Sequence, residues 1–89
     1  MVTNPDDADL ARGRDGEAIL AARVDARAAD AEKAGDHDTA TALRLQAGEH
    51  HRRARALDEA LRAAQGRRRA ELALTLRQHQ AGAGNEVAR

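Results

Sequence analysis

The 89-residue sequence contains no cysteine, phenylalanine, tyrosine or tryptophan, and it has no serine. Without cysteine the chain cannot form a disulfide framework, a thiolate nucleophile or a cysteine zinc site. Without aromatic residues it lacks the stacking platforms on which single-stranded nucleic-acid binders rely. These absences exclude a disulfide-stapled secreted scaffold and leave few side chains that could perform chemistry.

Long apolar runs are also missing. No stretch approaches the roughly 20 apolar residues needed to span a bilayer, and no signal-peptide apolar core follows Met1. We therefore expect a soluble cytoplasmic protein. Alanine is the commonest residue and nearly all basic residues are arginine, a bias typical of a GC-rich genome, so we expect a bacterial protein.

Large apolar side chains are scarce once alanine is set aside. A single small domain of this kind buries only a modest share of the surface that its unfolded chain exposes. The conformational entropy lost when the chain is ordered opposes the stabilisation from that burial. We expect a second copy or another protein to complete the core. The large apolar residues between the chain ends are Leu10, Ile19, Leu20, Val24, Leu43, Leu45, Leu57, Leu61, Leu72, Leu74 and Leu76.

Residues 33–39 divide two alanine-rich helical segments and predict a tight reversal of the chain. Gly35 can adopt the left-handed conformation that ends a helix, and Asp36 or Asp38 can accept hydrogen bonds from the first amides of the next helix. The predicted fold class is all-α: an antiparallel helical hairpin with its turn at 34–38. Its long second helix is either continuous or kinked or broken near Gly66, and two copies are expected to form a dimeric helical bundle.

The first segment has two parts. Asn4, Pro5 and the acidic residues after them predict a helix start, but Gly13 and Gly16 leave a break or kink open, so residues 1–16 are assigned to a frayed helical segment. The hairpin occupies 17–80, and the unpatterned residues 81–89 are expected to be a disordered tail. At about 100° per residue, one stripe of the first helix comprises Leu20, Val24, Ala28 and Ala31.

The second segment carries two apolar stripes on the same helical wheel. The first is predicted to face the first helix, and its members are Leu43, Ala47, His50, Ala54, Leu57, Leu61, Ala64, Leu72 and Leu76. The second lies on nearly the opposite side, where a two-helix monomer would leave it in water, so we expect it to be an interface. The candidate interface residues are Leu45, Ala56, Ala63, Ala70 and Leu74.

The turn and its flanks resemble part of a tetratricopeptide hairpin. The match comprises the spacing of Gly35, Asp36 and Asp38 relative to Ala40 and Ala47, together with the first-helix positions Val24, Ala28 and Ala31. Arg44 stands where that family has a large apolar residue, and a single unit cannot form a solenoid. A generic helical hairpin is therefore the preferred interpretation.

Charge is divided unevenly although it sums to zero. Residues 1–38 contain 10 acidic and 5 basic residues, and residues 39–89 contain 5 acidic and 10 basic ones. Folding the halves together would pair an acidic helix with a basic one, which is the preferred interpretation. A basic helix along a nucleic-acid backbone is the alternative. The candidate nucleic-acid contacts are Arg52, Arg53, Arg55, Arg67, Arg68 and Arg69.

Catalytic and metal-binding patterns are weak. The hydroxyl groups are Thr3, Thr39, Thr41 and Thr75, and none lies in a nucleophile motif. His50 and His51 are adjacent and point about 100° apart, so they do not form the i, i+4 pair of a helical zinc site. We expect no catalytic residue, metal, cofactor or small-molecule substrate, and no contact with membranes. The preferred function is a small non-catalytic helical interaction module, an adaptor, regulator or assembly factor, that self-associates or binds a larger protein.

Overall fold

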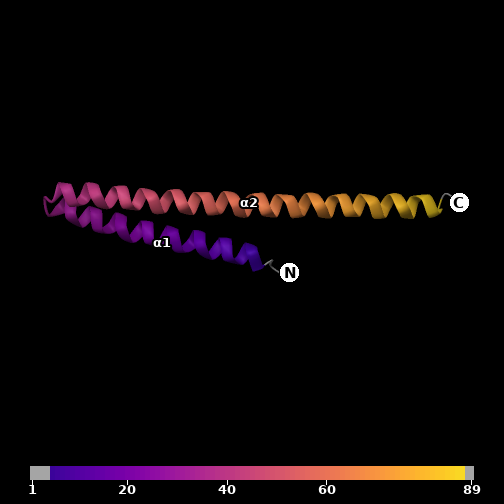
Figure 1. Ribbon diagram of the computed structural model, residues 1–89, viewed down its shortest axis with the longest axis horizontal. Coiled ribbons are helices and arrows are strands. Elements are labelled where there is room, and N and C mark those ends of the chain that lie inside the picture. Colours follow the sequence, from indigo (N-terminus) through magenta and orange to yellow (C-terminus); the bar gives the residue numbers. More distant parts are fainter. Residues whose placement is uncertain (1–4, 88–89) are drawn as a thin grey trace.

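A computed structural model describes residues 5–87, and its side chains are described over 6–82. It consists of two helices in antiparallel arrangement, α1 (Pro5–Lys33) and α2 (His37–Val87) (Figure 1). No strand occurs within the described residues. The predicted all-α helical hairpin with a long second helix is therefore confirmed.

Both helices are continuous through their glycines. α1 passes through Gly13 and Gly16 without interruption, and α2 passes through Gly66. α2 runs on to Val87, whereas the sequence pattern placed the end of the hairpin at Gln80. Alanine, leucine and arginine surround these glycines, and such strong helix formers offset the roughly 1 kcal/mol that each glycine costs. The predicted N-cap Asn4 and residues 88–89 lie outside the described residues.

The contact between the helices follows a seven-residue repeat. Over residues 7–31 of α1 and 40–68 of α2, every position spaced alternately by three and four residues along one side is shielded from solvent, and no other side of these two stretches shows this pattern. This spacing is that of a coiled coil, in which slight underwinding keeps one seam against the neighbouring helix. In α1 the repeat comprises Asp7, Leu10, Arg14, Glu17, Ala21, Val24, Ala28 and Ala31, and in α2 Ala40, Leu43, Ala47, His50, Ala54, Leu57, Leu61, Ala64 and Arg68.

Side-chain size changes along this seam. Near the turn the fully buried residues are small, with Ala21, Ala28 and Ala40 at 0–1% exposure. Toward the open end the seam instead contains Arg14 and Leu61. Small residues let helix axes approach closely, and long ones hold them apart. Figure 1 shows the result, because α1 lies against α2 at the turn and diverges from it toward the N-terminus.

Three sequence assignments require correction. Leu20, placed in the buried stripe of the first helix, is 41% exposed, and the adjacent Ala21 is buried instead. Leu72 and Leu76, placed in the stripe facing the first helix, are more than half exposed. Leu20 lies beside the seam position Ala21, and Leu72 and Leu76 lie beyond Arg68, where α1 no longer covers α2.

The molecule is a rod. Its extents are 82 × 18 × 15 Å and its radius of gyration is 22.6 Å, whereas a compact domain of this length would have a radius near 12 Å. α2 is the longer helix, so its C-terminal part extends past the beginning of α1 (Figure 1). We call the described side chains beyond the last seam residue, residues 69–82, the α2 extension.

Candidate functional site

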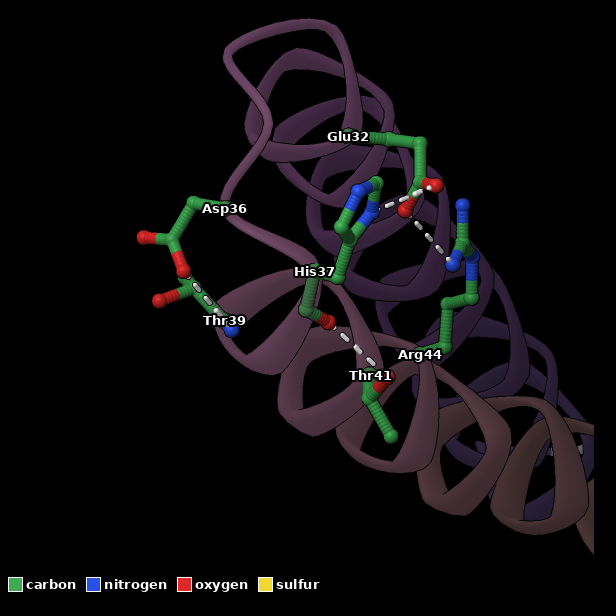
Figure 2. Close-up of polar contacts among 6 residues, drawn as sticks. All are labelled: Glu32, Asp36, His37, Thr39, Thr41 and Arg44. Carbon is green, nitrogen blue, oxygen red and sulfur yellow. Dashed lines mark hydrogen bonds and ion pairs between the residues drawn. The ribbon is translucent and has the colours of Figure 1, made fainter.

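The turn is fixed by hydrogen bonds at both helix ends. The amide of Gly35 donates to the carbonyl of Glu32 (3.0 Å) and the amide of Asp36 donates to that of Ala31 (2.9 Å), which closes α1 with Gly35 at φ 81°. The Asp36 carboxylate then accepts a hydrogen bond from the Thr39 amide at 3.2 Å and caps α2 (Figure 2).

Asp36 is the turn residue with the clearest electrostatic effect. Hydrogen bonds from the Thr39 side chain, and next from its amide, hold the pKa of Asp36 below its ordinary value of 3.8. Glu32 adds a link between the two helices, because its carboxylate contacts His37 Nδ1 at 2.9 Å and Arg44 Nη1 at 3.2 Å (Figure 2). Asp38, the third turn residue singled out in the sequence, lies in the exposed first turn of α2.

Charged pairs cross the open half of the hairpin. Arg14 Nη1 lies 3.0 Å from Asp58 Oδ1, and the hydrogen bonds that the Arg14 guanidinium donates to Asp58, and then to Asp15, raise its pKa. Glu17 Oε2 lies 2.5 Å from His50 Nδ1 and 3.8 Å from Arg53 Nη1. The acidic and basic halves are thus partly neutralised across the seam.

The outermost of these pairs is the most enclosed. Asp7 is only 7% exposed, and its Oδ2 accepts a hydrogen bond from Arg68 Nη2. The other carboxylate oxygen, Oδ1, is buried and has no hydrogen-bond partner among the residues that the structure describes. Sequence reasoning missed Asp7, Arg14 and Glu17 as seam residues, because apolar periodicity gives no weight to charged side chains. Their seven-residue spacing to Ala21, Val24 and Ala28 was the available signal.

The six candidate arginines fall into two classes. Arg53 and Arg68 face α1 and pair with its carboxylates, Glu17 and Asp7. The other four are exposed and form no ion pair among the described side chains: Arg52, Arg55, Arg67 and Arg69. Ion pairs with carboxylates of α1 therefore neutralise only two of the six candidate arginines.

The candidate interface residues lie on the side of α2 that α1 leaves uncovered. All are exposed in the hairpin, and Leu45 and Leu74 are exposed by 70% and 54%. Ala56, Ala63 and Ala70 are exposed as well. With Leu72 and Leu76, the α2 extension presents leucines on two sides, because Leu74 is rotated by about 200° from Leu72.

The histidines are dispersed. His37, His50 and His51 each contact a different carboxylate of α1, and the contact between His51 Nε2 and Asp25 Oδ2 measures 3.0 Å. His79 is exposed in the extension. Within 6–82, no three histidine or acidic side chains gather in a group that could hold a metal ion. Neither helix, over its described length, has a segment long and apolar enough to cross a membrane.

The described residues thus form a capped turn, a seam with charged pairs, and an α2 extension with exposed leucines, and four of their arginines have no ion pair among the described side chains. Comparisons of the chain with protein-family models, with curated proteins and with solved structures found no match.

Proposed function

We propose that this protein is a small, non-catalytic interaction module that self-associates through the uncovered surface of α2. The observation that carries the proposal is the exposure of Leu72, Leu74 and Leu76, at 61%, 54% and 53%, in a segment that α1 does not reach. Burying one leucine contributes about 1.5–3 kcal/mol. In the monomer these three leucines are more than half exposed, so most of this stabilisation is not obtained.

A second copy of the chain is the partner that fits this surface best. Ala56, Ala63 and Ala70 form a smooth side that ends at Leu74, and small residues allow two helices to approach closely in a symmetric contact. The α2 extension itself carries little net charge, because its charged residues are two arginines and one glutamate, Arg69, Arg77 and Glu71. The resulting assembly would be a dimeric helical bundle, serving as an adaptor, regulator or assembly factor in the cytoplasm.

The mass of the protein in solution tests the proposal. Multi-angle light scattering of the full chain should give a dimer, and both Leu74→Gln and the double change Leu72→Gln/Leu76→Gln should shift it toward a monomer. Ile19→Gln is the matched control, since Ile19 is 52% exposed on α1 and its loss should leave the dimer intact. A parent that is monomeric at every concentration would contradict the proposal.

A further inference from the structure

The outer side of α2 carries a row of arginines. Arg55, Arg62 and Arg69 recur every seven residues, which turns a helix to within about 20° of the same direction. Arg52 precedes them by three residues and lies on the same side. At about 1.5 Å per residue the row is roughly 25 Å long. All four side chains are exposed, whereas Leu57 and Leu61 between them are shielded against α1.

This arginine row is poorly neutralised. Arg62 contacts Asp58 at 2.9 Å, but the Asp58 carboxylate also forms an ion pair with Arg14 of α1. Arg52, Arg55 and Arg69 form no ion pair among the described side chains. The one other acidic residue on this side between 52 and 69 is Glu59. A chain without net charge therefore presents a straight cationic edge.

We infer that the arginine row, Arg52, Arg55, Arg62 and Arg69, binds the phosphate backbone of double-stranded nucleic acid without reading its sequence. A duplex is a rigid rod with one charge per about 1.7 Å of its axis, which matches a straight, rigid row of guanidinium groups. The absence of aromatic residues argues against single strands, whose non-specific binders rely on base stacking.

The inference is independent of self-association. Arg52, Arg55 and Arg62 lie on the part of α2 that α1 covers from the other side. Arg69 is the first residue of the α2 extension, which also contains the leucines of the proposed dimer contact. Loss of the dimer would leave the row in place. Loss of duplex binding would leave the dimer unaffected.

Fluorescence anisotropy of a labelled DNA duplex, titrated with the full chain at several salt concentrations, tests the inference. The parent should bind at low salt with a clear salt dependence. Arg52→Gln/Arg55→Gln/Arg69→Gln should make the slope of log K against log salt shallower by about 2.7, at about 0.9 per lost phosphate contact. The corresponding triple lysine variant keeps the charge and should keep the slope.

The matched control removes the same charge from the other helix. Arg23, Arg27 and Lys33 are exposed on α1 and form no ion pair among the described side chains, so changing all three to glutamine should leave the parent slope unchanged. Circular dichroism verifies that each variant is helical. Three results would overturn the inference. They are no binding of the parent to duplex DNA at low salt, an equal decrease of the salt slope in the α1 control variant, and binding of the parent to anionic phosphatidylserine vesicles without binding to the duplex.

Discussion

Gly35 is the residue on which the reversal of the chain depends most directly. Its φ of 81° lies in the left-handed region, and a Cβ built there would meet nothing within 4 Å. The cost of a side chain at this position is therefore conformational and involves no collision with neighbours.

Gly35→Val should lower the free energy of unfolding by more than about 1 kcal/mol, because a β-branched residue is disfavoured at positive φ. Chemical denaturation followed by circular dichroism measures the change. Gly16→Ala is the control: Gly16 lies within α1 with equally open surroundings, and alanine there should stabilise by up to about 1 kcal/mol. A Gly35→Val variant as stable as the parent would show that the turn tolerates another conformation.

Asp36 makes the turn sensitive to acid. Its pKa in the folded protein lies below the ordinary 3.8, so near that value the folded state binds fewer protons than the unfolded state. The stabilisation by ionised Asp36 is therefore complete above about pH 4 and is lost as the pH falls through the lowered folded-state pKa.

Asp36→Asn should flatten the decline of the thermal midpoint below about pH 4, because asparagine also caps a helix but does not titrate there. Thermal melts of parent and variant between neutral and strongly acidic pH measure the difference. Asp38→Asn, two residues further along and in the first turn of α2, is the control that should retain more of the decline. If the thermal midpoints of the parent and of Asp36→Asn fall in parallel as the pH is lowered, Asp36 does not contribute to the acid sensitivity.

At the scale of the helices, the sequence was informative about α2 and less so about α1. Shielded positions such as Ala47, Leu57 and Leu61 follow from apolar spacing, which a 3.6-residue wheel describes well along the part of α2 that α1 covers. In α1 the seam passes through Arg14 and Glu17, and their burial depends on partners more than thirty residues away. No local pattern reveals such pairing before the two helices are placed together.

The Asp7–Arg68 pair closes the open end of the seam, and it tests what holds the helices there. Arg68→Met should destabilise by about 1–3 kcal/mol, because it removes the hydrogen bond to Oδ2 of the buried Asp7 carboxylate, whose Oδ1 has no partner within the described part of the chain. Asp7→Leu/Arg68→Met should recover most of the loss, since apolar residues often replace an enclosed ion pair at little cost.

Urea denaturation of the two single variants and the double variant measures this coupling. Arg69→Met is the matched control, because Arg69 is exposed and outside the seam, and it should change stability by no more than about 0.5 kcal/mol. Additive effects of the Asp7 and Arg68 changes would mean that the pair contributes nothing as a pair.

At the scale of the whole molecule, the rod has little interior. Among the side chains of residues 6–82, the buried apolar ones are Ala21, Val24, Ala28, Ala40, Ala47 and Leu61, and no large one is completely enclosed. The sequence predicted this shortage of core, since so few large apolar residues are present. It could not show where α1 ends relative to α2, which decides that Leu72 and Leu76 stay uncovered.

Association should therefore contribute measurably to stability. If copies bind each other only when folded, the thermal midpoint of the helical circular dichroism signal should rise with protein concentration. Leu72→Gln/Leu76→Gln should reduce that dependence, whereas Ile19→Gln should preserve it. A midpoint that stays constant over a wide concentration range would indicate a hairpin that is stable alone.

The gradient in side-chain size along the seam also has a consequence for the order in which the chain folds. The connection between the helices is short, so closing it costs little entropy, and the alanines beside it, such as Ala28 and Ala40, pack without needing a charged partner. Helical turns form there within about a microsecond. We therefore expect the hairpin to close from Gly35 outward, so that Asp7 and Arg68 meet last. By the same reasoning, we expect unfolding to begin at the N-terminal end of α1.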